Sequence, residues 1–310
     1  MASSDQCAIA RQPVRVRLPG TPEPMHFWTG AGGVRIAGDA WGDPSAPLIV
    51  LLHGGGQTRH AWRGTGRQLG AAGYCAVAID ARGHGDSDWA PDADYAQHTL
   101  VQDLHCVLTA LGGARPVLIG ASMGGATSLV AVGEGHVDAA ALILVDIVPS
   151  TEAQGVHRIQ SFMRDRTEGF GTLEEVARAI GEYRGQRSGA GDLSGLAKNV
   201  RLGGDGRYHW HYDPRYAMAP RDHAMRRSRL SDCARRLNLP TLLVRGGMSD
   251  VVSDEGVQEF LAMAPHAEYV NVAEAGHMVA GDRNDAFGRA ATGFLARTVP
   301  SATSRKCRAL

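Results

Sequence analysis

Short apolar runs without polar alternation recur along the chain, separated by longer amphipathic stretches. Apolar runs of this kind are typical of parallel strands whose two faces are both covered by helices. Two earlier segments, 25–30 and 33–42, are predicted to form strands at an edge of the same sheet. The predicted buried strands are 46–53, 74–80, 115–121, 141–147 and 240–246, with a further strand at 267–273.

The intervening stretches have helical periodicity. Leu100, Leu104, Val107, Leu108 and Leu111 are spaced so that they fall on one helix face. Strands that alternate with helices imply a doubly wound, mostly parallel α/β sheet. Further helices are predicted over 254–263, with Ser253 or Asp254 as N-cap, and over 285–297.

The alternation of strands and helices stops between the strand at 141–147 and the strand at 240–246. The interrupting stretch is rich in charged and aromatic residues, and it predicts an inserted, mainly helical cap with a turn at the GGDGR sequence of 203–207. Both ends of the chain are predicted to be flexible. The predicted organisation is an arm over 1–24, a hydrolase-like core over 25–149 and 238–298, the cap over 150–237, and a tail over 299–310.

Composition excludes several classes of partner. The 310 residues contain 32 Lys and Arg against 32 Asp and Glu, so neither nucleic acid nor an anionic membrane is an expected partner. The five cysteines are scattered, which argues against a disulfide framework or a thiolate zinc site. No apolar run approaches a signal peptide or a transmembrane span, so we expect a cytoplasmic protein. The sequence leaves the oligomeric state open.

One serine stands where a predicted strand runs into a predicted helix. Ser122 is the centre of G-A-S-M-G, residues 120–124, which matches the G-x-S-x-G nucleophile elbow. The glycines permit a sharp turn that lifts the hydroxyl clear of the sheet, and the following helix N-terminus favours a developing negative charge. We therefore predict that Ser122 is a nucleophile.

A serine nucleophile needs a base and an acid that orients the base. His277 follows the last predicted strand and is the candidate base. Asp250, just beyond the strand at 240–246, is the preferred acid, because Ser122, Asp250 and His277 then follow the chain order that this architecture uses. Asp146, at the end of the preceding strand, is the alternative acid.

The same edge of the sheet offers two oxyanion donors. The amide of Met123 directly follows the nucleophile, and a second amide is expected from the glycines after the strand at 46–53. Gly55 is preferred there over Gly56. All of these residues lie beyond carboxyl ends of strands, where open α/β sheets bind ligands.

These motifs together resemble the α/β-hydrolase superfamily, in particular its capped esterase-like and haloperoxidase-like bacterial members. The resemblance covers residues 25–149 and 238–298 and includes HGGG, DARGHGDSD at 80–88 and GASMGG. It implies serine hydrolysis without a cofactor. Four residues of the 80–88 stretch are expected to brace the turn beside the site rather than to act in chemistry. They are Asp80, Arg82, His84 and Ser87.

The resulting hypothesis is a serine hydrolase that cleaves a small to medium apolar carboxylic ester through an acyl-enzyme on Ser122. Trp62, Phe162 and Trp210 are candidate lining residues of the substrate pocket. Lactonase, thioesterase and carbon–carbon bond hydrolase activities use the same triad and remain alternatives, as does a ligand-binding homologue without turnover. The H-x-H pair His209 and His211 lacks a third ligand, so no metal site is predicted.

Overall fold

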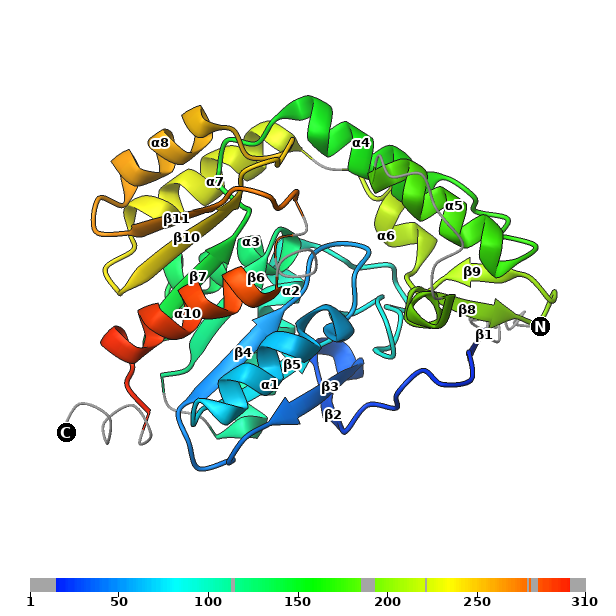
Figure 1. Cartoon of the computed structure of the whole chain (residues 1–310), viewed down its shortest axis with the longest axis horizontal. Helices are drawn as coiled ribbons and strands as arrows, with labels where there is room; N and C mark the ends of the chain where they lie inside the picture. Colours follow the sequence, from blue (N-terminus) through cyan, green and yellow to red (C-terminus); the bar gives the residue numbers. More distant parts are fainter. Residues whose placement is uncertain are drawn as a thin grey trace, which may run out of the picture.

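The chain forms an eight-stranded sheet flanked by helices, with a cap at one side (Figure 1). The structure is a computed structural model that describes residues 15–112, 115–184, 193–220, 222–277, 279 and 284–301. The strands of the large sheet are β2 (His26–Thr29), β3 (Arg35–Trp41), β4 (Leu48–Leu52), β5 (Cys75–Ile79), β6 (Val117–Ala121), β7 (Ala141–Val145), β10 (Thr241–Gly246) and β11 (Glu268–Val272).

Their order across the sheet is β11-β10-β7-β6-β4-β5-β3-β2. Neighbours from β11 to β5 pair in parallel, whereas β3 pairs antiparallel with both β5 and β2 at the edge. The predicted doubly wound, mostly parallel sheet is confirmed, and each predicted strand is present within two residues of its predicted ends.

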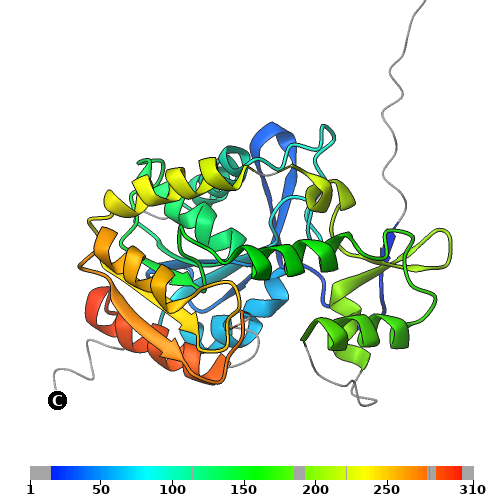
Figure 2. The ribbon, with the colours of Figure 1, turned by 90° about the horizontal axis from the view of Figure 1, so that it is seen from above.

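Helices cover both faces of this sheet, as the view from above shows (Figure 2). Helices α3 and α7 lie on one side of the sheet, and α1 and α10 lie on the other. Ser253 is the N-cap of α8, as predicted, and its hydroxyl accepts a hydrogen bond from the Gly256 amide. The core helices are α1 (Arg63–Ala71), α2 (Gln97–Leu111), α3 (Met123–Gly133), α7 (His223–Arg235), α8 (Asp254–Met263) and α10 (Asn284–Thr298), with the 3₁₀ helices η1 (Ala31–Gly33) and η2 (Arg59–Trp62).

Each central strand contributes side chains to two hydrophobic clusters. On β4, Val50 and Leu52 pack with α2 and α3, whereas Ile49 and Leu51 pack on the opposite face with α1 and α10. Successive side chains of a strand point to opposite faces, so an uninterrupted apolar run fills both clusters. This is the physical basis of the runs that the sequence displays.

The cap differs in two respects from the predicted mainly helical insertion over 150–237. It contains an antiparallel hairpin whose turn lies at the predicted Gly203–Arg207 position, with the Gly203 amide donating to the Arg207 carbonyl. In addition, α7 packs on α3 and buries Leu230 and Cys233 in the main core, so the second core segment begins at α7. The cap elements are α4 (Ala153–Arg164), α5 (Leu173–Arg184), η3 (Leu193–Asn199), β8 (Val200–Gly203), β9 (Tyr208–Trp210) and α6 (Pro214–Met218).

The two terminal segments are held more firmly than the sequence predicts. Strand β1 (Arg15–Arg17) of the predicted flexible arm pairs antiparallel with β8 and extends the cap hairpin to three strands (Figure 1). At the other end, Ser301 is buried and its hydroxyl donates to the Ala72 carbonyl over 2.8 Å. Residues 1–14 and 302–310 of the predicted arm and tail lie outside the described residues.

Candidate active site

Ser122 lies at a sharp turn between β6 and α3. Its backbone has φ +47° and ψ −107°, a conformation that residues with side chains rarely adopt. The flanking glycines allow the helix to start this close to the sheet, because a Cβ on Gly120 would lie 2.4 Å from the Gly124 carbonyl oxygen. A Cβ on Gly124 would in turn lie 2.4 Å from the carbonyl oxygen of Leu52. The local geometry is that of the predicted elbow.

His277 is oriented by a buried carboxylate. Its Nδ1 lies 2.6 Å from Oδ2 of Asp146, the residue that follows β7. Asp146 is fully buried, and it also accepts hydrogen bonds from the Gly246 amide over 2.9 Å and the Ser249 hydroxyl over 2.6 Å. Three donors therefore surround one carboxylate, which fixes the ring of His277.

The structure corrects the preferred choice of acid. The Asp250 carboxylate lies 2.9 Å from the Arg158 guanidinium of α4 and its side chain is 35% exposed. The turn after β10 instead presents Ser249 to the Asp146 carboxylate. Because β7 lies next to β6 in the sheet, the residue after β7 is the one held beside the elbow. The alternative acid of the sequence analysis, Asp146, is thus the partner of His277.

The loop after β4 is fixed on both sides of Gly55. The Gly54 amide donates to Oε1 of Gln57 over 2.9 Å, and the Gly56 amide donates to Nε2 of His84 over 3.2 Å. The Gly56 carbonyl accepts from Nε2 of His211 over 3.0 Å. Both neighbours of Gly55 are therefore engaged, and Gly55 lines the same cavity as Ser122 and Met123.

Three buried histidines support this loop as neutral rings. One nitrogen of each ring accepts a hydrogen bond from a backbone N–H. The donor is Ala81 for His53, Gly56 for His84 and Gly85 for His211. The other nitrogen of each ring faces a backbone carbonyl oxygen at 2.7–3.1 Å. Burial, which disfavours the charged form, lowers the pKa of His53 and His84 and lowers that of His211 to about 3.

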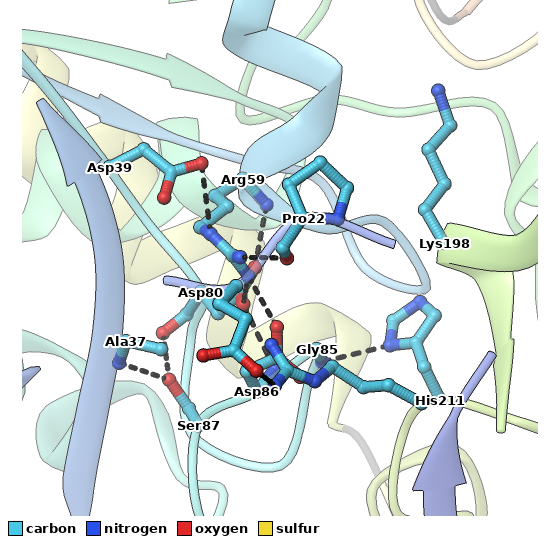
Figure 3. A network of polar contacts seen from close by, with 12 residues as sticks. Pro22, Ala37, Asp39, Arg59, Asp80, Gly85, Asp86, Ser87, Lys198 and His211 are labelled. Atoms are coloured by element: carbon cyan, nitrogen blue, oxygen red, sulfur yellow. Dashed lines mark hydrogen bonds and ion pairs between the residues drawn. The ribbon is translucent and has the colours of Figure 1, made fainter. Parts of the chain in front are cut away.

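A buried ion network lies next to these histidines (Figure 3). The Arg59 guanidinium contacts Asp80 at 2.6 Å, Asp86 at 2.8 Å and Asp39 at 3.1 Å, and Arg201 of the cap reaches Asp86 at 3.0 Å. Burial raises the pKa of the Asp80 carboxyl, but the Arg59 charge, together with smaller effects that include hydrogen bonds from the Arg59 and Asp86 amides, outweighs burial and holds this pKa below its ordinary value. The network ties the cap to the loop at 80–88.

The prediction that four residues of the 80–88 stretch brace the turn is confirmed by their contacts. Ser87 donates to the Asp80 carbonyl over 2.7 Å and accepts from the Ala37 amide over 2.9 Å (Figure 3). Arg82 forms a bidentate salt bridge with the Asp103 carboxylate, with nitrogen–oxygen distances of 2.5 and 2.6 Å. These bonds connect the stretch to β3 and α2, next to the cavity that holds Ser122.

A cavity of about 830 Å³ separates the sheet edge from the cap. The core side of the cavity is lined by Ser122, Met123, Gly55 and His277. The opposite side is lined by residues of α4, α5, η3, β9, α6 and α7. Its size is within the usual range for small-molecule sites. The structure places all three candidate pocket aromatics on its wall, together with two further cap residues. These are Trp62, Phe162 and Trp210, with Met163 and Tyr212.

The two histidines of the H-x-H pair have different partners. His209 pairs with Asp205 at 2.9 Å on the cap hairpin, whereas His211 binds backbone groups of Gly56 and Gly85. No group of three or more His, Cys, Asp or Glu suited to a metal ion occurs among the described residues.

The fold, the elbow, the histidine and the buried acid define a hydrolase architecture, and comparison with known proteins agrees. The family model of the alpha/beta hydrolase fold matches residues 47–283, so the chain belongs to the α/β-hydrolase family. The prediction of this family and of a hydrolase is confirmed. None of the helices that the structure describes is long and apolar enough to cross a membrane.

Particular relatives are enzymes of this family. The chain is 30% identical over 253 residues to an esterase of Mycobacterium tuberculosis, covering 78% of this chain and 80% of the relative. It is 29% identical over 262 residues to a 3-hydroxybutyrate-oligomer hydrolase of Cupriavidus necator, covering 80% and 88%. A crystal structure of an alpha/beta hydrolase from Novosphingobium aromaticivorans superimposes with a TM-score of 0.74 at 26% identity, covering 88% and 97%.

Sequence reasoning did not identify three residues that the structure places at the site. Gln57 holds the Gly54 amide, Ser249 donates to Asp146, and Tyr216 of the cap reaches Met123. Gln57 directly follows HGGG, so its place in the sequence could have identified it as a residue of this loop. Ser249 and Tyr216 carry no local signal of their roles, because these depend on how distant segments meet.

Proposed function

We propose that this α/β-hydrolase cleaves small to medium apolar carboxylic esters through an acyl-enzyme on Ser122. The observation that carries the proposal is the 2.6 Å contact between Asp146 and His277 in the cavity that also exposes the strained Ser122 elbow. An imidazole held in one orientation by a buried carboxylate is what a serine base requires. The esterase and hydrolase relatives support ester bonds as the substrate class.

In this mechanism, Nε2 of His277 takes the proton of the Ser122 hydroxyl as Oγ attacks the ester carbonyl carbon. The Met123 and Gly55 amides stabilise the oxyanion, and Asp146 stabilises the protonated imidazole. The carbon–oxygen bond to the alcohol then breaks, and His277 protonates the leaving alcohol. Water attacks the acyl-enzyme by the reverse proton transfers, which releases the acid and free Ser122.

The cavity supports an apolar substrate of moderate size. Its wall includes aromatic side chains from both the core and the cap, and Trp62, Trp210 and Tyr212 are each less than one-tenth exposed. Aromatic surfaces favour apolar acyl or aryl groups because contact removes both from water. We expect the length of the preferred acyl chain to follow the space between Ser122 and Phe162.

The test is steady-state hydrolysis of p-nitrophenyl esters from acetate to laurate by the wild type and by Ser122→Ala. We expect turnover of short or medium esters and a loss of about 10⁶-fold in kcat on replacing the nucleophile. Ser161→Ala, an exposed serine on α4, is the matched control and should retain wild-type activity.

Two results would contradict the proposal. Full activity of Ser122→Ala would remove the serine from the mechanism. A wild type that is inert on every ester would exclude simple esterase activity, and the same variants would then be assayed on thioesters, lactones and carbon–carbon bond substrates. Labelling of Ser122 by a fluorophosphonate without turnover of any of these would indicate a binding protein.

A further inference from the structure

The hydroxyl of Tyr216 lies close to the two residues whose amides are the proposed oxyanion donors, Gly55 and Met123. Its oxygen is 3.0 Å from Sδ of Met123, and a Cβ built on Gly55 would be 2.8 Å from the same oxygen. Tyr216 belongs to α6 of the cap, it is 5% exposed, and it lines the cavity that contains Ser122. A cap residue therefore brings a hydrogen-bond donor to the part of the cavity that Gly55 and Met123 line.

Groups of the core hold the Tyr216 ring in this position. The ring packs edge-on against His84, with centroids 4.6 Å apart, and against Tyr95, with centroids 5.8 Å apart. His84 is itself fixed by the Gly56 amide, next to Gly55. The orientation of the hydroxyl thus depends on the same loop that supplies the oxyanion amide.

The short helix α6 is anchored to the core by its N-cap. Asp213 accepts a hydrogen bond from the Arg215 amide over 2.9 Å and another from the Tyr95 hydroxyl. The Arg215 guanidinium also donates to the Ala90 carbonyl over 2.9 Å. Asp213 is fully buried, and its hydrogen bonds fix the first turn of α6, which carries Tyr216.

The hydroxyl donates to the Met123 sulfur, an acceptor that a substrate oxygen can displace. A thioether sulfur is a weak acceptor, whereas a carbonyl oxygen that gains negative charge is a strong one. A small rotation of the O–H bond would exchange the Met123 sulfur for the oxygen of a bound ester. The stronger bond would form as charge develops, which is the condition for lowering the barrier.

We propose that the Tyr216 hydroxyl is a third donor to the oxyanion, supplied by the cap in addition to the Gly55 and Met123 amides. This inference rests on the proposed serine-hydrolase function. It makes the cap part of the reacting site, so that the oxyanion site is complete only when α6 is seated on the core.

The first test compares Tyr216→Phe with Tyr74→Phe. The control residue is buried on the face of the sheet that α1 and α10 cover, outside the cavity lining, and its hydroxyl donates to the Val299 carbonyl over 3.1 Å. We expect Tyr216→Phe to lower kcat by about 10- to 100-fold with little change in KM, because two backbone donors remain. Tyr74→Phe should change kcat less than about 3-fold.

A second readout separates oxyanion stabilisation from general packing. An alkyl boronic acid forms a tetrahedral adduct with a catalytic serine, whereas the matching carboxamide binds as a ground-state analogue. Tyr216→Phe should weaken boronate affinity by a factor similar to its loss in kcat and leave carboxamide affinity within about 3-fold. Equal losses for both ligands, or wild-type kcat and boronate affinity, would overturn the proposal.

The failure of this inference is distinguishable from failure of the proposed function. If Ser122→Ala is inactive while Tyr216→Phe retains full activity, the serine mechanism stands and only the role of Tyr216 is wrong. If the wild type hydrolyses no ester and forms no boronate adduct, the proposed function fails and this inference fails with it.

The placement of the hydroxyl has its own test in Gly55→Ala. In the wild type the new methyl group meets the Tyr216 oxygen at 2.8 Å, whereas the nearest ring carbons lie at 3.6 Å, an ordinary contact distance. Gly55→Ala should therefore lower Tm in the wild type and lower it less in the Tyr216→Phe background. An identical decrease in both backgrounds would show that Tyr216 does not occupy this position.

Discussion

At the scale of single residues, the site is built on two unusual backbone conformations. Ser122 and Asp146 both have positive φ, +47° and +50°, although neither is a glycine. Such conformations cost on the order of 1–3 kcal/mol each and persist only when the surrounding packing enforces them. Both residues directly follow central strands, β6 and β7, whose buried side chains supply that packing.

The choice between the two acids can be tested by Asp146→Asn and Asp250→Asn. An amide at 146 cannot stabilise a protonated His277, so we expect kcat to fall by about 10³- to 10⁴-fold. Asp250 pairs with the half-exposed Arg158, and such pairs contribute about 0–1 kcal/mol, so Asp250→Asn should keep near wild-type kcat. Ester hydrolysis by both variants is the measurement, and the reverse ranking would restore Asp250 as the acid.

At the scale of elements, the hairpin of β8 and β9 is the link between cap and core. It carries Arg201, which reaches Asp86, and it leads into His211, which binds the Gly56 carbonyl in the loop after β4. Strand β1 pairs with the outer edge of this hairpin and so covers an otherwise open edge. The hairpin therefore positions the cap wall of the cavity by polar contacts on one side and strand pairing on the other.

Arg201→Met tests this link. The variant removes a buried hydrogen bond between charged groups, which should cost about 2–3 kcal/mol in the free energy of unfolding. Arg235→Met, which removes an exposed pair with Asp232 on α7, should change stability by less than about 1 kcal/mol. Denaturant unfolding of both variants measures the difference, and equal effects would show that the cap does not depend on Arg201.

At the scale of the whole molecule, three neutral histidines lie between the core loops and the cap. His53, His84 and His211 connect the loops after β4 and β5 with the cap through backbone hydrogen bonds. A proton added to the accepting nitrogen of any of these rings would break one of those bonds. The positive charge of Arg201 also opposes a charge on His211.

Stability should therefore fall on the acid side. The pKa of His211 is about 3 in the folded protein against 6.5 in the unfolded chain, so the contribution of this ring to stability is constant well above pH 6.5 and declines as the pH falls toward 3. Linkage gives a loss of about 2 kcal/mol at pH 5 from this residue.

Denaturant unfolding between pH 5 and pH 8 measures this loss. His211→Gln keeps a hydrogen-bond donor and an acceptor but does not titrate. Between pH 8 and pH 5 it should lose about 2 kcal/mol less in the free energy of unfolding than the wild type loses. His105→Gln, an exposed histidine on α2, is the control and should behave as the wild type. An unchanged slope in His211→Gln would contradict the assignment of a neutral, buried ring.

The strands and the elbow were predictable because their signals are local. The apolar runs fill both faces of the sheet, and G-A-S-M-G combines a strand end, close-packing glycines and a helix start within a few residues. His277 was identifiable from its place after the last strand. The loop at 80–88 was also interpreted correctly, since its polar residues follow directly after β5.

The cap was less predictable because its structure depends on distant partners. The sequence around Val200 carries no local strand pattern. The hairpin is completed by β1, which lies far away in the chain. Helix α7 has charged residues on several sides, yet it buries Leu230 and Cys233 against α3. Local periodicity does not reveal which face of such a helix meets the core.

The sequence by itself determined the sheet, the elbow, the histidine and the edge at which they gather, because each follows from a short apolar run or a turn-forming motif. Only the tertiary structure decided that Asp146 rather than Asp250 holds His277, and that Tyr216 reaches Met123 and the loop at Gly55. Both acids follow strand ends at the same edge, so the choice depends on which carboxylate faces His277, and the Asp250 carboxylate pairs with Arg158 of the cap. The position of Tyr216 depends on how the cap packs on the core, and a linear pattern does not record such packing.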